Sequence, residues 1–422
     1  MALSRRTFIK GLVAASGAGA IARRVSGQQA AGRVVVVGAG YAGATAAKYI
    51  RLLAPEIEVT LVERNSDFVS CPLSNLVLGG SKTLRDITVS YDGLQKYGVK
   101  VVRDEAVAGD PTRHAVHLAS GSTLAYDRLI VAPGIDFMYE GLPGLASPDA
   151  RTRVLHAWKA GTETAMLRKQ LEAMPDGGVY AIHIPLAPYR CTPAPYERAC
   201  QVAFYFKRSK PKSKVLVLDA NEDVQAERAL FVAAWNDSYK GMIEYRPNSG
   251  LVDVDAATLT AKLDFEDVQA DVLNVVPPQK AALFAERLGL ITANKRWCGV
   301  DWLTMESIRI PGVHVLGDAT LAAPAMPKAG QMANQHAKVC AGAVTALITN
   351  RPINQDPVLA STCYSFVDDR NAGHIAGEYT YDAGQKTMVQ KQRSSELSEK
   401  ANEVDGAHAM SWAKNIWADM LA

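Results

Sequence analysis

Residues 34–43 read Val-Val-Val-Val-Gly-Ala-Gly-Tyr-Ala-Gly, and this stretch decides the fold. The valine run predicts a buried strand, and the glycines predict a tight turn into a helix that packs closely on it. These glycines are Gly38, Gly40 and Gly43. A second apolar run, residues 59–62, predicts the next strand and ends at Glu63, about 20 residues after the last glycine. Since an acid at that place accepts hydrogen bonds from a ribose, we predict a dinucleotide-binding βαβ unit.

The N-terminus has the features of an export signal. Arg5 and Arg6 precede a mildly apolar run up to Ala22, which is typical of twin-arginine signals. The run is too short and too weakly apolar to span a bilayer, and no later stretch predicts a membrane span. We therefore expect residues 1–30 to be removed and the mature chain to reach the periplasm. Their loss turns the formal charge of +3 slightly negative, and nothing predicts nucleic-acid binding.

The pattern of the remaining chain predicts more than one domain. Its length exceeds what a single core usually serves. Strand patterns at 179–184 and 215–219 predict a second α/β unit within the first. We predict an α/β fold with two Rossmann-like dinucleotide-binding domains and a C-terminal α+β interface domain. The expected boundaries are 31–150 and 275–350 for the first domain, 151–274 for a degenerate NAD-like domain and 351–422 for the C-terminal domain.

The second unit lacks a glycine loop. Its first strand runs into a segment that includes Pro185 and Pro188, and proline has no N–H group to hold a phosphate. Asp219, at the end of the next strand, looks like the remnant of a ribose-binding acid. We therefore expect a domain that keeps its architecture without binding NAD(P).

A later strand, residues 310–316, runs into Gly317 and Asp318. This pattern resembles flavin-dependent oxidoreductases with two dinucleotide domains, in which such an Asp binds the ribityl chain. The segment that contains Lys328 then opens an alanine-rich helix up to Thr349, whose N-terminus would face the flavin ring. A Tyr126-Asp127 pair before an apolar strand and a small-residue turn, residues 128–134, also resembles these flavoproteins. Together with the glycine loop and the Gly317-Asp318 pattern it makes three separated matches, which favour FAD over NAD, with Gly317, Asp318 and Lys328 as further cofactor-binding residues.

The cysteine motifs are more specific. They closely resemble those of the flavoprotein subunit of flavocytochrome c sulfide dehydrogenase, and the resemblance covers essentially the whole mature chain. The motifs are Phe68-Val69-Ser70-Cys71-Pro72-Leu73-Ser74-Asn75, Tyr189-Arg190-Cys191-Thr192-Pro193-Ala194-Pro195-Tyr196-Glu197-Arg198, Trp297-Cys298-Gly299-Val300-Asp301 and Thr362-Cys363-Tyr364-Ser365.

The resemblance implies roles for three of the cysteines. Cys71 would be joined to FAD by a thioether, whereas a buried free thiol is the alternative. Cys191 and Cys363 would form a redox-active disulfide over the flavin ring, whereas a structural disulfide is the alternative. Hydrosulfide is a soft nucleophile that attacks disulfide sulfur, and the resulting thiolate could pass two electrons to FAD.

The remaining candidate residues carry weaker signals. Glu197 matches a family position proposed to handle protons near the disulfide. Cys200, Cys298 and Cys340 are expected to be core thiols. The Cys and His spacing predicts no metal site, and no Cys-x-x-Cys-His motif predicts a haem on this chain.

The resemblance therefore implies a periplasmic sulfide dehydrogenase that oxidises hydrosulfide to sulfur or polysulfide. Its electrons would go from FAD to a c-type cytochrome on another chain. Sulfide:quinone oxidoreductase is the nearest alternative, because it shares the fold, FAD and a cysteine pair. A non-catalytic redox or sulfur-carrier flavoprotein subunit is a further alternative, against which the presence of both Cys191 and Cys363 argues.

Overall fold

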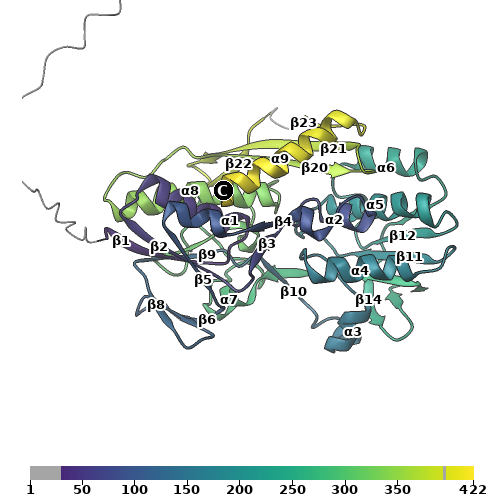
Figure 1. Cartoon of the computed structure of the whole chain (residues 1–422), viewed down its shortest axis with the longest axis horizontal. Helices are drawn as coiled ribbons and strands as arrows, with labels where there is room; N and C mark the ends of the chain where they lie inside the picture. The colour runs from purple at the N-terminus through teal and green to yellow at the C-terminus, as the bar shows by residue number, and fades with distance from the viewer. Residues whose placement is uncertain (1–29, 393–395) are drawn as a thin grey trace, which may run out of the picture.

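The computed structural model describes residues 30–392 and 396–422. The predicted export signal lies outside these residues except for Ala30. Two parallel sheets lie side by side, and a C-terminal antiparallel sheet with a long helix runs along the top of both (Figure 1). This arrangement confirms the predicted α/β fold class.

The first sheet is built around the valine strand and is parallel throughout. Its strands, in spatial order, are β19 (Val313–Val315), β9 (Arg128–Val131), β1 (Gly32–Val37), β2 (Ile57–Glu63) and β5 (Val99–Arg103). Helices α1 (Tyr41–Leu53) and α8 (Gly330–Ile348) pack against each other in this half of the molecule. The last four residues of β1, Val34 to Val37, are all buried, as expected for a central parallel strand.

The second sheet comes from the chain between β9 and β19, and it is also parallel. Its strands are β13 (Ile243–Arg246), β12 (Lys214–Asp219), β11 (Val179–Ile184) and β17 (Val272–Val275). The helices of this unit are α4 (Thr162–Ala173), α5 (Ala194–Ser209) and α6 (Arg228–Asp237). Helix α4 begins directly after Gly161, whose φ of +142° is incompatible with a helical turn.

The C-terminal sheet is antiparallel. Its strands are β20 (Val358–Phe366), β21 (Ala372–Asp382), β22 (Thr387–Gln390) and β23 (Glu396–Leu397). Helix α9 (Glu403–Leu421) packs on β21 and α1, and β20 contacts both α5 and α8. The C-terminal sheet therefore joins the two parallel halves (Figure 1).

Short elements complete the described chain. The antiparallel ones are β3 (Asp67–Val69), β4 (Thr88–Ser90), β6 (Ala106–Asp110), β7 (Ala115–Leu118), β8 (Thr123–Ala125), β10 (Ile135–Phe137), β14 (Leu251–Asp255), β15 (Thr260–Leu263), β16 (Asp267–Gln269) and β18 (Gln279–Ala281). The short helices are α2 (Ser74–Gly79), α3 (Pro148–Arg153) and α7 (Leu283–Arg287). Strands β10 and β18 pair with each other where the chain passes between the two halves.

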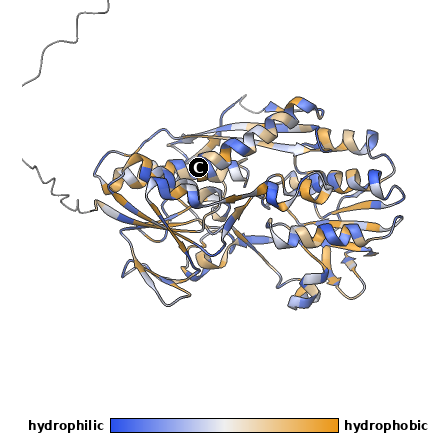
Figure 2. Cartoon of the chain, viewed as in Figure 1, coloured by the Kyte–Doolittle hydropathy of each residue, from blue (hydrophilic) through white to orange (hydrophobic). Residues whose placement is uncertain are grey.

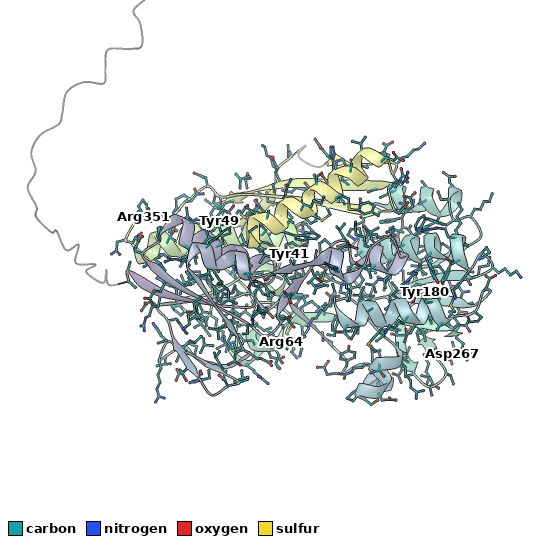
Figure 3. All side chains as sticks on the ribbon, viewed as in Figure 1. Tyr41, Tyr49, Arg64, Tyr180, Asp267 and Arg351 are labelled. Carbon is teal, nitrogen blue, oxygen red and sulfur yellow. The ribbon has the colours of Figure 1, made fainter. Side chains whose placement is uncertain are left out.

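Burial follows the amphipathic pattern of the sequence. Apolar residues concentrate along the strands and inner helix faces (Figure 2). Tyr180 of β11 is fully buried, whereas Arg64, Asp267 and Arg351 lie at the periphery (Figure 3). No helix in the described part of the chain is both long and apolar enough to cross a bilayer.

Candidate active site

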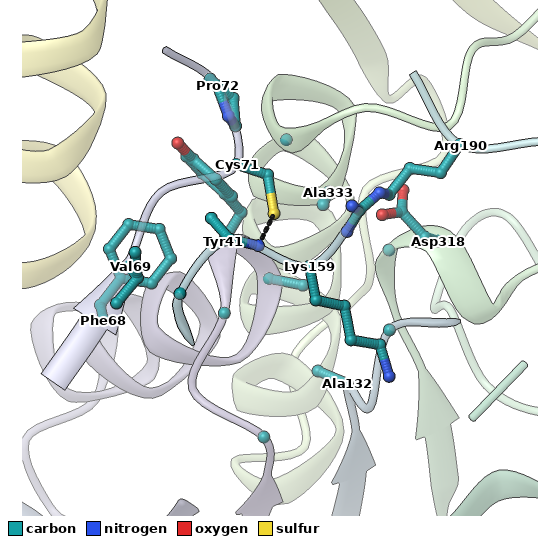
Figure 4. A pocket seen from close by; sticks show the side chains of 18 of the residues that line it. Tyr41, Phe68, Val69, Cys71, Pro72, Ala132, Lys159, Arg190, Asp318 and Ala333 are labelled. Atoms are coloured by element: carbon teal, nitrogen blue, oxygen red, sulfur yellow. Dashed lines mark hydrogen bonds between the residues drawn. The ribbon is translucent and has the colours of Figure 1, made fainter. Parts of the chain in front are cut away.

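A cavity of about 790 Å³ lies where the first sheet, α5 and β20 meet. Its volume is in the usual range for a cofactor or substrate pocket. The lining brings together residues from distant parts of the chain, among them Gly38, Cys71, Cys191, Asp318 and Cys363. The part of the cavity around Cys71 is seen from close by in Figure 4.

The glycine loop has the geometry that a pyrophosphate requires. Gly38 has φ of +92°, and a Cβ there would lie 2.4 Å from the Ala132 carbonyl oxygen. A Cβ on Gly43 would lie 1.7 Å from the Gly38 oxygen, so only glycine allows α1 to pack this closely. Gly40 has open space beside it and lines the cavity, directly before the N-terminus of α1. Its backbone can therefore approach a phosphate.

Glu63 ends β2 and also lines the cavity. Its Oε2 accepts a hydrogen bond from the Ala39 N–H at 2.8 Å, and its Oε1 accepts one from the Asn65 N–H at 2.9 Å. The carboxylate thus fixes the glycine loop relative to the second strand. Its contact with a ribose stays a prediction.

Cys71 lies on the cavity wall between β3 and α2. Its Sγ accepts a hydrogen bond from the Ala160 N–H at 3.4 Å, which holds the thiol toward the cavity (Figure 4). On the same wall Arg190 and Asp318 lie next to each other (Figure 4). This placement suits a thiol that bonds to a cofactor, and the thioether itself stays a prediction.

Cys191 and Cys363 come together on this cavity from α5's leading loop and from β20. Both are free thiols in the structure, so their disulfide stays a prediction. Burial raises the pKa of Cys363 to about 12 and raises that of Cys191 well above its ordinary value. The charge of Cys363 is the next largest influence on the pKa of Cys191, which marks the two thiols as neighbours.

Glu197 lies in the first turn of α5 and is buried. Its Oε1 accepts a hydrogen bond from the Phe366 N–H at 3.0 Å, and its Oε2 accepts one from Asn75 Nδ2 at 2.7 Å. Burial raises the pKa of Glu197 to about 7, although both hydrogen bonds oppose the shift. A carboxyl with this pKa on the cavity wall can both take up and release a proton near neutral pH.

The cofactor-binding residues predicted after β19 are Gly317, Asp318 and Lys328. Gly317 (φ of +69°) and Asp318 line the large cavity. Burial raises the pKa of Asp318 against the opposing charges of Arg190 and Lys328. Lys328 does not line the large cavity but shares a small adjoining one with Gly317 and Asp318, and its Nζ donates to the Asp318 carbonyl oxygen at 3.0 Å. Its ammonium is therefore placed to support the Asp318 turn, and its contact with a cofactor stays a prediction.

Three further residues that line the cavity, Asn75, Arg190 and Arg198, were not predicted from the sequence as site residues. The Nε of Arg190 is buried and has no hydrogen-bond partner in the described chain. Arg198 donates from Nε to Asn75 Oδ1 at 3.0 Å, and Asn75 in turn donates to Glu197. Arg198 therefore positions the Glu197 carboxyl through Asn75. All three residues lie in or next to the cysteine motifs, but only the fold brings them together.

The acid of the second unit is engaged internally. Asp219 is fully buried, and its Oδ2 accepts hydrogen bonds from Tyr196 at 2.7 Å and Tyr245 at 3.1 Å. Its Oδ1 accepts from the Asn221 N–H at 3.0 Å. The carboxylate is thus satisfied within the protein, and the expected loss of NAD(P) binding stays a prediction. In the described residues no three His, Cys, Asp or Glu side chains converge as a metal site would require.

Comparison with known proteins identifies the family. Residues 164–277 match the family "Sulfide dehydrogenase [flavocytochrome c] flavoprotein chain, central", and residues 355–421 match "Flavocytochrome c sulphide dehydrogenase, flavin-binding". The chain is also 62% identical over 45 residues to the sulfide dehydrogenase [flavocytochrome c] flavoprotein chain of Chlorobaculum thiosulfatiphilum, covering 94% of that sequence and 11% of this one. The chain belongs to this family. Residues 32–170 match the pyridine nucleotide-disulphide oxidoreductase family, in line with the flavocytochrome c sulfide dehydrogenase fold.

More distant relatives share the fold. The mitochondrial sulfide:quinone oxidoreductase of Mus musculus is 24% identical over 303 residues, which span 68% of this chain and 65% of the mouse protein. The crystal structure of the Aquifex aeolicus sulfide:quinone oxidoreductase superposes with a TM-score of 0.74 at 18% identity, covering 92% of this chain and 91% of that one. At this identity the superposition establishes the fold alone.

The cavity fits FAD. The glycine loop leaves room for a pyrophosphate, and the unpartnered Arg190 Nε offers a donor to a polar group beside Cys71 and Asp318. Together with the match to a flavin-binding family over residues 355–421, these features support FAD as the cofactor.

Proposed function

We propose that the protein oxidises hydrosulfide to zero-valent sulfur or polysulfide at a Cys191–Cys363 disulfide. One observation carries this proposal: Cys71, Cys191, Cys363 and Glu197 all line the cavity that begins at the glycine loop. Bound FAD would accept an electron pair and pass the electrons on singly. Gly38, Gly40, Gly43, Glu63 and Asp318 would hold it, and Cys71 would anchor it covalently.

The reaction begins on the two cysteines. Hydrosulfide attacks one sulfur of the disulfide, so that a persulfide forms on that cysteine and the other leaves as a thiolate. Loss of two electrons and one proton then re-forms the disulfide and frees one sulfur atom in the zero-valent state. Atoms and charge balance, because hydrosulfide contributes one sulfur, one proton and one negative charge.

Glu197 would accept the persulfide proton. It lines the same cavity, and its pKa of about 7 lets the ionised carboxylate act as a base near neutral pH. Asn75 and the Phe366 N–H keep its two oxygens in place. Positioning of this kind reduces the cost of orienting the base for each proton transfer.

The proposed electron acceptor is a c-type cytochrome on another chain, and the proposed location is the periplasm. The family name supports the cytochrome, since the relatives that it describes are flavocytochrome c chains. The twin-arginine pattern at Arg5 and Arg6 supports the location, and it lies outside the described residues.

A quinone is the second candidate acceptor. The mouse relative and the Aquifex aeolicus structure are both named for quinone as their partner in sulfide oxidation. Sulfide oxidation by either route would use the same cysteines. The two routes differ only in what removes electrons from the flavin.

Parallel turnover assays distinguish the acceptors. Purified mature protein receives sulfide together with either cytochrome c or a short-chain quinone. The proposal predicts faster reduction of cytochrome c, and a matched Cys191→Ser variant should reduce neither acceptor. Preferential quinone reduction would replace the cytochrome route, and sulfide turnover unchanged in Cys191→Ser would contradict the disulfide mechanism.

A further inference from the structure

A second buried acid lies beside the strand that carries Cys363. Glu227 directly precedes α6 and is only 3% exposed. Its Oε2 accepts a hydrogen bond from the Ser365 hydroxyl, whereas its Oε1 is buried and has no partner in the described chain. Unlike Glu197, Glu227 does not line the large cavity. Its hydrogen bond with Ser365 links it to β20 and so to the site.

Strand β20 connects both acids to the cysteine. Ser365 lies two residues after Cys363, so the two side chains point to the same face of the strand. The next residue, Phe366, donates its N–H to Glu197. One short stretch of strand thus holds a carboxyl from α5 and a carboxyl from the start of α6.

The surroundings of Glu227 are acidic. Glu197 from α5 and Asp405 from α9 both raise its pKa by charge repulsion, while the Ser365 hydroxyl lowers it. His374, from β21, is paired with Asp405, with 3.1 Å between Nδ1 and Oδ1. Burial is the largest influence and raises the pKa of Glu227 to about 8. The carboxyl is therefore mainly neutral at pH 7 and ionises in mildly alkaline solution.

Glu227 and Cys363 are coupled by charge. After burial, the charge of Glu227 is the largest influence that raises the pKa of Cys363, ahead of that of Glu197. Coupling of this kind is reciprocal, so a negative charge at Cys363 favours the protonated form of Glu227 to the same degree. Whichever sulfur hydrosulfide attacks, a thiolate or a persulfide is left on Cys363.

We propose that Glu227 is a second proton-holding residue of this site, which binds a proton while negative charge resides at Cys363 and releases it when that charge leaves. The role rests on the proposed sulfide oxidation. Near and above pH 8, where the resting carboxyl is largely ionised, the proton comes from solvent when hydrosulfide brings its charge into the site, and it returns to solvent once the electron pair has moved on. Glu227 thereby limits the net charge in a buried site without touching the substrate.

Cysteine alkylation tests the coupling without sulfide. The FAD-loaded chain is reduced with a phosphine and treated with iodoacetamide between about pH 6 and about pH 10, because the thiolate is the reacting form. Peptide mass spectrometry reads the rate at Cys363. Glu227→Gln retains the acceptor for Ser365 but cannot ionise. We expect Cys363 of this variant to be alkylated at the wild-type rate in acid and faster than in the wild type above pH 8. The alkylation rate should rise about tenfold for each unit by which the variant lowers the pKa of Cys363.

Two further variants make the test specific. Glu222→Gln removes an exposed acid from the same region and should leave the rate profile unchanged. Ser365→Ala removes the hydrogen bond that favours ionised Glu227, so Glu227 should ionise, and slow the alkylation of Cys363, only at a higher pH than in the wild type. This variant tests the proposal if Glu227→Gln does not fold. Identical alkylation profiles in the wild type, Glu227→Gln and Ser365→Ala would overturn the proposal.

A sulfide experiment separates this inference from the proposed function. The pH profile of flavin bleaching by sulfide should lose its limb near pH 8 in Glu227→Gln, because that limb reports the carboxyl with a pKa of about 8. A retained limb would overturn the proton-holding role. If sulfide does not bleach even the wild type, the proposed function fails, whereas a changed alkylation profile would still establish the coupling.

Discussion

The position of Cys71 on the cavity wall decides whether its thiol can bond to FAD. Its thiol lies on the cavity wall and is held by the Ala160 N–H, within the same lining as Gly40 and Asp318. A covalent bond from this thiol would keep FAD in place without further binding energy.

Replacing Cys71 therefore gives a direct prediction. Cys71→Ser should fold and bind FAD, because the change is small and the glycine loop is untouched, but it should release nearly all its FAD on acid precipitation. The wild type and Cys363→Ser should keep the flavin in the pellet. Flavin retained in the Cys71→Ser pellet would exclude the thioether.

Glu197 and Glu227 illustrate how burial sets charge at the residue scale. Both carboxyls have pKa values raised by burial, to about 7 and about 8. A group whose pKa is raised by folding releases its proton on unfolding, so its contribution to stability is lost as pH rises through the folded value. The two carboxyls therefore contribute least to the free energy of unfolding in alkaline solution, where both are ionised beside the cysteines.

At the scale of elements, the β1-loop-α1 unit was predictable because its signals are local. Gly38, Gly40 and Gly43 follow a valine strand at fixed spacing, and the close contacts at Gly38 and Gly43 are those that the tight turn and the helix packing require. The cysteine motifs were found in the same way, by resemblance over short stretches.

The residues that sequence reasoning missed owe their roles to long-range contacts. Asn75 meets Glu197 only after α2 packs on α5, and Glu227 meets Ser365 only after α6 approaches β20. Neither Asn nor Glu has a local pattern that marks it as part of a site. Lys328 shows the converse, since its helix was predicted while its ammonium lies on backbone carbonyls outside the large cavity.

The close packing of α1 on β1 yields a prediction for the whole element. In Gly43→Ala the new Cβ would lie 1.7 Å from the Gly38 oxygen, so the helix must shift and deform the phosphate loop. We expect loss of bound flavin in the purified protein and destabilisation by about 1–3 kcal/mol, measured by absorbance and denaturant unfolding. Gly342→Ala in α8, where a Cβ meets nothing within 4 Å, is the control and should retain flavin. Full flavin content in Gly43→Ala would contradict the proposed role of the loop.

At the scale of the whole molecule, the fold combines three sheets into one site. The first sheet supplies the nucleotide loop, the second supplies α5 with Glu197, and the C-terminal sheet supplies Cys363. The second unit keeps the Rossmann architecture, but its acid, Asp219, is bound by the protein's own hydroxyl and amide groups. Its present role is to position a cysteine and a carboxyl beside the cavity of the first.

Anaerobic titration of the flavin absorbance with sulfide tests the central claim most directly. The account predicts that sulfide bleaches the wild-type flavin, and that Cys363→Ser resists sulfide but is still bleached by dithionite, because only the disulfide route is lost. Dithionite bleaching of the variant also shows that its FAD is bound and reducible. Sulfide bleaching of Cys363→Ser at the wild-type rate and extent would contradict the account.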